Sequence, residues 1–296
     1  MILDKFINKS NIKKYNAIAD EVDKMFEKET SKMTIDELKE ALHVLKNTDN
    51  KIMDKKKKTI RALAIAKSAS KQVLGMTYYR VQLLGGMALI DGNMAEMKTG
   101  EGKTLTCSIA TITNFALGFK THVITANEYL STRDEETLKP LYSALGIKSA
   151  TNVAQQGQQE KKEAYASDIL YSTASELGFD YLRDNLVQNI EDKVQPLNFQ
   201  EVKIIIDEAD FVLIDEATTP LIISGQKPLK DLDIYFKIRE MTADFTPVSL
   251  DPHASRLEID SFVVDGDFWL DKKSKRTFLS DIGFEKLEKR VVEYGI

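Results

Sequence analysis

Cysteine is almost absent from this sequence: Cys107 is the only one among 296 residues, so the chain cannot form an internal disulfide. No run of about 18 apolar residues occurs, which excludes a membrane-spanning helix, and residues 1–16 lack the apolar core and the small-residue cleavage site of a secretory signal. An excess of positive charge is missing as well, because the net charge is −5. We therefore expect a cytoplasmic protein with no nucleic-acid partner.

What the sequence does contain is enough apolar material, 43% of its residues, for a sizeable core. In residues 1–75 this material recurs at helical spacing, and Thr34 followed by Glu37 indicates a capping box at the start of a helix. The next helical pattern includes a run of four lysines, 55–58, and ends at Gly75. We predict a helical N-terminal segment over 1–75, with the lysine run either solvated or in contact with an anionic lipid surface or a partner.

Residues 76–225 have a different pattern, in which short apolar runs alternate with helical stretches. The runs HVITA, DILYST and VKIIID occupy residues 122–126, 168–173 and 202–207, and each is typical of a buried strand. Strands that alternate with helices form parallel sheets covered by helices. We predict an α/β domain with a parallel sheet and helices on both faces, ending near Gly225.

Residues 226–296 change in character again, and they are polar and mixed up to residue 260. Two β-rich runs then flank a polar turn at residues 271–275, and the helical pattern DIGFEKLEKRVVEYG follows. This pattern predicts the opening of a second, smaller domain. Because the sequence stops without a feature that closes such a domain, we expect the chain to be a fragment.

The stretch AEMKTGEGKTLT, residues 95–106, comes close to the phosphate-binding pattern G-x-x-x-x-G-K-[ST], with Met97 in place of the first glycine. Glycines let backbone N–H groups turn toward phosphate oxygens, Lys103 reaches the β and γ phosphates, and the Thr104 hydroxyl can ligate Mg²⁺. A short apolar stretch precedes the loop and an apolar-faced helical pattern follows it, so we expect a strand, a loop and a helix. A surface turn that contains G-E-G-K-T by chance is the alternative.

Asp207 and Glu208 stand at the end of the apolar run VKIIID, where an acidic pair completes such a site. The first carboxylate would hold Mg²⁺, usually through water, and the second would polarise the attacking water. Gln82 lies 21 residues before Lys103 and offers an amide that pairs with both a donor and an acceptor on the adenine edge. The G-x-G-K-T loop and the D-E-A-D letters together resemble the RecA-like motor core of superfamily-2 helicases, in which the first glycine is commonly absent.

Four longer segments narrow this resemblance: VQLLGGMALIDGNMAEMKTGEGKTLT, VITANEYLSTRDEE, LGFDYLRDNL and IDEADFVLIDEATTPLIISG. On these segments the sequence resembles the SecA family, ATPases that drive preproteins through the bacterial SecY channel. The resemblance is dense over residues 73–225 and looser at both ends. It implies that 76–225 is a first RecA-like nucleotide-binding domain, interrupted after TPLIISG by a preprotein cross-linking domain. Residues 226–296 resemble the beginning of that insertion.

The resemblance also implies roles for individual residues. Gln82 would contact adenine, Asp207 would serve the magnesium ion together with Thr104, and Glu208 would activate water. Catalysis would depend on Glu208, Asp207 and Lys103. The residues expected to wrap the phosphates are Gly100, Glu101, Gly102, Lys103 and Thr104.

Two further residues carry alternatives that stay open. Arg133, in YLSTRD, matches an arginine that the family places near the nucleotide, but it would also pair with Asp134 or Glu135 on a helix surface. Tyr79 falls where an aromatic side chain could pack on the adenine, and a core position is the alternative.

For the intact protein, the resemblance implies an ATPase that uses ATP or ADP with Mg²⁺ and couples ATP binding and hydrolysis to preprotein movement. The expected partners are the SecY channel complex and preprotein substrates, at the inner face of the cell membrane as a peripheral protein. An anionic membrane surface and a homodimer of the full-length parent stay open. The second RecA-like lobe is missing from this sequence, so we expect little or no turnover from the chain alone.

Three questions remain at this stage. A superfamily-2 RNA or DNA helicase would share the nucleotide chemistry, and a non-catalytic interaction module would keep a degenerate nucleotide fold. Within the SecA family, residues 47–58 are short and lysine-rich, and Thr218 stands where the common form has arginine. Both differences favour an accessory paralogue with a narrower set of substrates over the housekeeping type.

Overall fold

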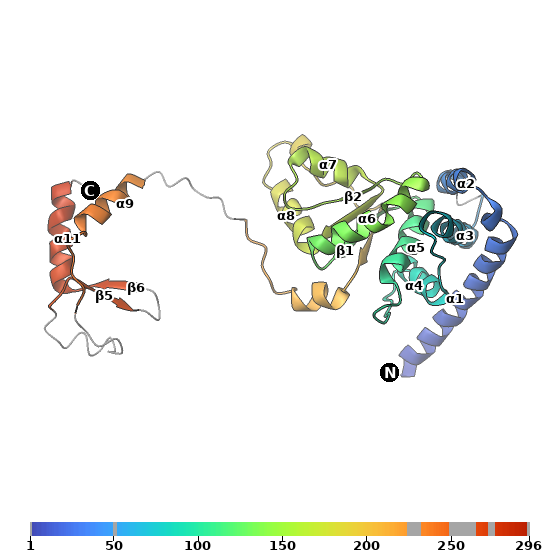
Figure 1. Cartoon of the computed structure of the whole chain (residues 1–296), viewed down its shortest axis with the longest axis horizontal. Coiled ribbons are helices and arrows are strands. Elements are labelled where there is room, and N and C mark those ends of the chain that lie inside the picture. Colours follow the sequence, from blue (N-terminus) through green and yellow to red (C-terminus); the bar gives the residue numbers. More distant parts are fainter. Residues whose placement is uncertain (1, 50–51, 224–231, 249–264, 272–275, 295–296) are drawn as a thin grey trace. The chain divides into compact units, whose positions relative to one another are not determined.

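The chain forms two compact units, Met1–Ile223 and Ser224–Ile296 (Figure 1). The larger unit contains every residue of the predicted nucleotide site. The computed structural model describes residues 2–49, 52–223, 232–248, 265–271 and 276–294.

The first part of the larger unit is helical, as predicted. Its elements are α1 (Ile2–Lys28), η1 (Thr30–Lys32), α2 (Ile35–Asn47), α3 (Lys55–Leu74) and α4 (Arg80–Ile90). The predicted capping box is confirmed, because the Thr34 N–H donates to Glu37 Oε2 at 2.7 Å and the Thr34 hydroxyl accepts from the Glu37 N–H. The predicted end of α3 is also confirmed: Gly75 adopts the left-handed conformation with φ +68°.

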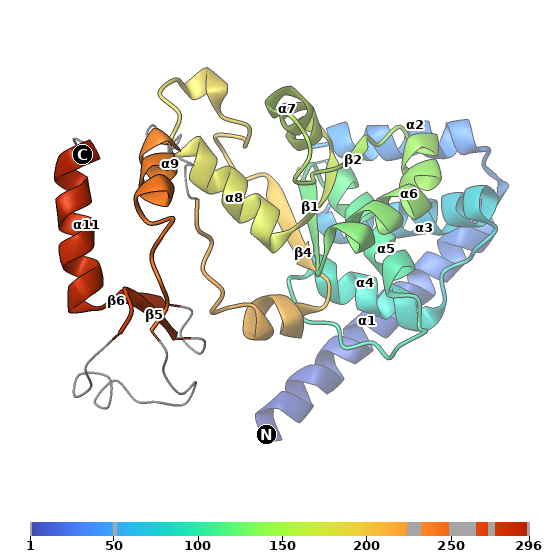
Figure 2. The ribbon, with the colours of Figure 1, turned by 60° about the vertical axis from the view of Figure 1, so that its left-hand side comes forward.

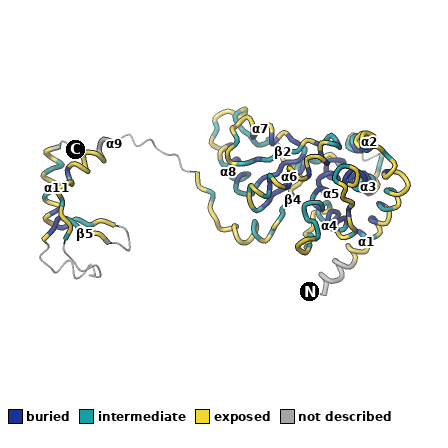
Figure 3. The backbone as a smooth tube through the Cα atoms, in the orientation of Figure 1, coloured by how far each residue is buried: buried dark blue, intermediate teal, exposed yellow. Residues whose placement is uncertain are grey.

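Helix α3 is buried along most of its length, because α1, α2, α5 and α6 all pack against it (Figure 3). The lysine run at its start is therefore only partly solvated. Lys55 and Lys57 are exposed, and Lys56 pairs with Glu21 at 2.9 Å, but Lys58 is buried and its ammonium donates to the carbonyl of Thr48. Among the described residues, no helix combines the length and the apolarity needed to cross a membrane.

The second part is a parallel four-stranded sheet. Its strands are β1 (Lys120–Thr125), β2 (Ser149–Thr151), β3 (Ile169–Thr173) and β4 (Val202–Ile206), in the order β2-β3-β1-β4. Val123 lies opposite Tyr171 on one side and Ile205 on the other, so the carboxyl ends of the three longer strands meet at one edge. The three predicted strands are confirmed. Strand β2 was not predicted because its three residues contain no apolar run.

Helices cover both faces of this sheet, as predicted. They are α5 (Lys103–Ala116), α6 (Glu128–Ala144), α7 (Gln158–Ala166) and α8 (Ala174–Asp184), with short turns η2 (Ile190–Asp192) and η3 (Phe211–Asp215). Ile169 and Tyr171 of β3 belong to the main core, which includes side chains of α3, α5 and α6, whereas Leu170 between them packs on Tyr165 of α7. Figure 2 shows α8 on one side of the sheet and α5 and α6 on the other.

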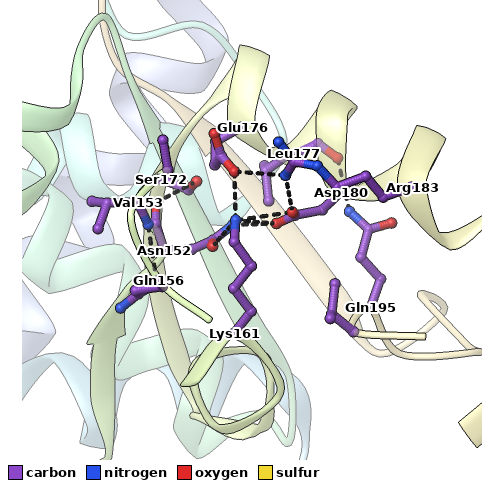
Figure 4. A network of polar contacts seen from close by, with 12 residues as sticks. Asn152, Val153, Gln156, Lys161, Ser172, Glu176, Leu177, Asp180, Arg183 and Gln195 are labelled. Carbon is purple, nitrogen blue, oxygen red and sulfur yellow. Dashed lines mark hydrogen bonds and ion pairs between the residues drawn. The ribbon is translucent and has the colours of Figure 1, made fainter. Parts of the chain in front are cut away.

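A buried ionic cluster fixes α7 to α8 (Figure 4). The Lys161 ammonium donates to both oxygens of Asp180, at 2.9 and 3.1 Å, and also to Glu176 and Asn152. Arg183 covers the two carboxylates from the solvent side. Because two cations match two carboxylates, the buried charges are compensated. Asp180 and Arg183 belong to the GFDYLRDN segment, which therefore has a structural role here.

The smaller unit contains α9 (Leu232–Met241), β5 (Phe268–Asp271), β6 (Arg276–Leu279) and α11 (Asp281–Tyr294). Strands β5 and β6 pair antiparallel, and Trp269 stacks on Phe278 with ring centroids 5.2 Å apart. Residues 226–231, 249–264 and 272–275, including most of the polar turn predicted at 271–275, lie outside the described part of the chain.

Candidate nucleotide-binding site

The predicted phosphate loop lies between α4 and α5 and ends at the start of a buried helix. Gly100 and Gly102 have φ angles of +86° and +80°, a conformation that side-chain-bearing residues avoid. Gly102 is the N-cap of α5 and provides no side-chain cap, so side chains leave the N–H groups of the first turn open. This helix end is suited to an anion such as a phosphate.

The loop is closed by hydrogen bonds of its own and by one from α4. The Lys98 N–H donates to the Glu101 carboxylate at 2.9 Å, and the Glu101 N–H donates to the Lys98 carbonyl at 3.2 Å. From α4, Gln82 Nε2 donates to the Glu101 carbonyl at 2.9 Å. A Cβ atom on Gly102 would lie 2.4 Å from that nitrogen, so glycine is required here both by φ and by space.

One sequence prediction is wrong: no strand precedes the loop. Residues 93–98 have no regular structure, because among the described residues no strand runs beside them to share their backbone hydrogen bonds. Met97 instead packs on α4, where its sulfur would lie 3.0 Å from a Cβ atom on Gly85. The position that lacks the usual glycine is therefore filled by a side chain that lines the site.

The acidic pair stands at the carboxyl end of β4. The Asp207 N–H donates to the Ile124 carbonyl at 2.8 Å, which continues the sheet by one residue, and the Asp207 carboxylate accepts the Glu208 N–H at 3.1 Å. Glu208 has φ +51°, and no other non-glycine residue of the described chain has a positive φ. Such strain is maintained where a side chain has to be held in one direction.

The loop lysine pairs with Glu208 and, together with Asp207, borders one small pocket. Lys103 Nζ lies 3.3 Å from Glu208 Oε1. The pocket, of about 70 Å³, is bordered by Lys103, Thr104 and Asp207, with Met97 and Cys107 among its other lining residues. Burial raises the pKa of the Asp207 carboxyl above its usual range, and the neighbouring charge of Glu208 raises it further, while Lys103 lowers it.

The two residues predicted to contact adenine differ in exposure. Gln82 is buried, and its Oε1 accepts the Tyr79 N–H at 2.9 Å while its Nε2 holds Glu101. A side-chain amide still has one N–H and one lone pair to offer after these two bonds. Tyr79 is 70% exposed, so the alternative of a core position does not apply to it.

Arg133 lies on α6, and its guanidinium donates to Asp134 Oδ1 from Nε at 2.9 Å and from a terminal nitrogen at 2.7 Å. The pairing weighed as its alternative is thus present. Asp134 itself was not predicted as a site residue, yet it borders the same pocket as Asp207. The sequence signal was only its position beside Arg133. Cys107 also borders the pocket, and burial raises the pKa of its thiol well above the usual range.

The residues present fit a magnesium ion that is bound together with a nucleotide. Within the described ranges, no group of three or more His, Cys, Asp or Glu side chains is arranged to hold a metal ion. The Thr104 hydroxyl and the Asp207 carboxylate border one pocket, and Mg²⁺ typically takes one or two such oxygens and completes its shell with phosphates and water.

A model of the SecA DEAD-like domain matches residues 3–275 of this sequence. The chain belongs to the SecA family. It is 44% identical over 237 residues to the protein translocase subunit SecA of Polynucleobacter asymbioticus, a match covering 79% of this chain and 25% of that protein. It is 45% identical over 235 residues to the same subunit of a Psychrobacter species, covering 79% and 24%. The chain thus spans about a quarter of the length of these curated relatives.

Membership of the SecA family confirms the resemblance drawn from the four segments and decides against a general superfamily-2 helicase. The parallel sheet with helices on both faces is the RecA-like architecture expected of this DEAD-like domain. The individual site residues, the domain limits and the paralogue type stay predictions.

Proposed function

We propose that this chain is the first nucleotide-binding lobe of an ATP-driven motor for protein export. In the intact protein the lobe couples ATP binding and hydrolysis to the movement of preproteins through the SecY channel. The proposal rests mainly on one observation: the glycine loop ends at a helix N-terminus where Lys103, Thr104 and Asp207 border one pocket and Lys103 also pairs with Glu208. The family match and the relatives' name, protein translocase subunit SecA, support protein translocation as the process that ATP hydrolysis drives.

Each side chain has a role that its position supports. The open N–H groups at the start of α5 bind the β phosphate, with Lys103 on the β and γ phosphates and Thr104 on magnesium. When bound, the magnesium ion neutralises charge on these phosphates. Asp207 holds it through water, and Gln82 reads the adenine edge with its remaining N–H and lone pair.

Glu208 is the proposed water-activating base. In the structure the Glu208 carboxylate pairs with Lys103, the lysine proposed to bind phosphate. While this ion pair is formed, the carboxylate is not free to accept a proton from water. A nucleotide that draws Lys103 toward its phosphates leaves Glu208 free to accept the proton of the attacking water. Arg133, half-exposed and paired with Asp134, and Tyr79, exposed at the start of α4, complete the proposed nucleotide contacts.

Partners and location follow from the same proposal. Preproteins and the SecY complex are the proposed partners, and the protein acts at the inner face of the cell membrane as a peripheral component. The exposed Lys55 and Lys57 offer a contact for an anionic membrane surface. Transition-state arginines belong to the second lobe and are worth about 10³ to 10⁵ in rate, so the chain alone binds nucleotide but hydrolyses it barely.

Calorimetric titration of the 296-residue chain with ADP and Mg²⁺ tests the proposal. Lys103→Ala should weaken ADP binding about 10- to 100-fold, because it removes charge-assisted hydrogen bonds to phosphate. Lys98→Ala is the matched control, since it truncates a lysine of the same loop whose backbone N–H, not its ammonium, makes the bond that closes the loop. Its affinity should equal that of the unchanged chain.

Absence of ADP binding by the unchanged chain would leave the alternative of a non-catalytic interaction module. Equal affinities of the Lys103→Ala and Lys98→Ala variants would remove Lys103 from the site even if binding occurs.

A further inference from the structure

Asp134 is a buried carboxylate beside the proposed nucleotide pocket, with no role assigned so far. It lies on α6, and only 5% of its surface is exposed. The residues that border the pocket with it include Thr104 and Asp207. A charged group buried to this degree requires a partner or a bound cation.

Only one of the two Asp134 oxygens is used within the protein. Both hydrogen bonds from Arg133 fall on Oδ1, at 2.9 and 2.7 Å, and no group of the described chain donates to Oδ2. Every fully buried side-chain nitrogen or oxygen among the described residues has a hydrogen-bond partner, so Oδ2 is accessible to solvent. Asp134 borders the pocket, which offers a space for such a solvent molecule.

The charges around the pocket favour a cation between the two aspartates. Asp134 and Asp207 both border it, so two like charges lie beside the same small space. Arg133 pairs with Asp134, and Lys103 pairs with Glu208 at 3.3 Å, so among the described residues no ion pair compensates Asp207. A hydrated divalent cation relieves this repulsion, since carboxylates accept hydrogen bonds from its water ligands.

We propose that Asp134 is a positioning residue of the magnesium site: its Oδ2 would accept a hydrogen bond from a water ligand of a magnesium ion held beside Asp207. Arg133 fixes the orientation of the carboxylate by occupying Oδ1. The inference rests on the proposed function, because it requires a magnesium nucleotide beside Thr104. It differs from a role of Asp134 in orienting Arg133 toward phosphate, which would not depend on the metal.

ADP titrations of the full chain in Mg²⁺ and in EDTA separate these roles. Asp134→Asn removes the negative charge, and with its amide oxygen toward Arg133 it puts an N–H₂ donor where Oδ2 was. We expect the Mg²⁺-dependent gain in ADP affinity to fall about 10-fold, with the affinity in EDTA unchanged. Glu135→Gln is the matched control, because Glu135 is equally buried but bonded to Ser149 and outside the pocket.

Three results would overturn the role of Asp134. Asp134→Asn could leave the Mg²⁺-dependent gain intact, lower ADP affinity equally in Mg²⁺ and in EDTA, or match Arg133→Gln in both media. If the unchanged chain binds no ADP in either medium, the proposed function fails and the role of Asp134 fails with it. Asp134→Ser replaces the amide variant if circular dichroism indicates that the latter does not fold.

Discussion

At the scale of single residues, the acidic pair combines an unfavourable backbone conformation with a partly buried charge. Glu208 has a positive φ without being glycine, and Asp207 is a partly buried carboxylate beside another one. Both features reduce the stability of the folded chain in the absence of ligand. Costs of this kind are typical of functional sites, where a side chain is held for its chemistry and not for packing.

Asp207→Asn should therefore stabilise the unliganded chain at neutral pH. Because the folded-state pKa of Asp207 is raised, the stability linked to its protonated form is present below about pH 4 and is lost as the pH rises through the folded-state value. The melting temperature of the variant should exceed that of the unchanged chain by about 1–3 °C at pH 7, a small rise because solvent screens this carboxylate.

Thermal denaturation followed by circular dichroism from pH 3 to pH 7 measures this difference, which should grow with pH. Asp210→Asn, an exposed carboxylate three residues further on, serves as the control and should leave the melting temperature unchanged. A lower melting temperature of Asp207→Asn at pH 7 would contradict the raised pKa.

At the scale of elements, the loop from α4 to α5 is built by backbone geometry and one buried amide. Gly102 has to be left-handed to start α5, and Gln82 occupies the space where its side chain would be. The loop is thus held in shape by a hydrogen bond from α4. A preformed loop binds phosphate without first ordering its own backbone.

Gly102→Ala tests whether the contact of Gln82 with the loop supports ADP binding, with Gly92→Ala as a matched control. Both glycines have similar φ angles, +80° and +76°, but no atom lies within 4 Å of a Cβ on Gly92. Each variant should lose about 1–2 kcal/mol of unfolding free energy from the left-handed conformation. Only Gly102→Ala should also displace Gln82 and weaken ADP binding, by at least about 10-fold. Denaturant unfolding measures the loss of stability, and ADP titration measures the loss of affinity. Equal ADP affinities of the two variants would refute the role of Gln82 in holding the loop.

At the scale of the whole molecule, the chain consists of two units with separate stabilising contacts. The only tryptophan, Trp269, lies in the smaller unit, so its fluorescence reports the unfolding of that unit alone. There Asp244 forms two hydrogen bonds with the Arg290 guanidinium, which lower the pKa of its carboxyl to about 2.

Asp244→Asn should lower the melting temperature of the smaller unit at pH 7 by about 1–3 °C, a small change because Asp244 is exposed and solvent screens the pair. Since the folded-state pKa is depressed, the stability that this carboxylate contributes is present above about pH 4 and is lost as the pH falls toward 2. Tryptophan fluorescence between pH 3 and pH 7 should record a difference that shrinks with falling pH.

The far-UV circular dichroism transition of the larger unit should stay in place in this experiment. Glu240→Gln, an exposed carboxylate on α9, is the control and should change neither signal. If Asp244→Asn lowered the melting temperature by the same amount at every pH, the charge of Asp244 would not be the source of its contribution to stability.

Local signals were sufficient for much of the fold. The capping box at Thr34, the end of α3 at Gly75 and the three long strands depend on residues within a few positions of each other, and all were predicted. The sequence alone also determined the family, because GEGKT, the DEAD letters and the longer segments are contiguous in the chain.

Only the tertiary structure decided how distant segments combine. The residues before the phosphate loop do not form a strand, because a strand depends on a neighbour that a local pattern does not provide. Asp134 enters the pocket because α6 and β4 bring it beside Asp207, 73 positions away by number (207 − 134). Local residue patterns encode hydrogen bonds between near neighbours, whereas burial and charge in a pocket depend on which distant groups the fold brings together.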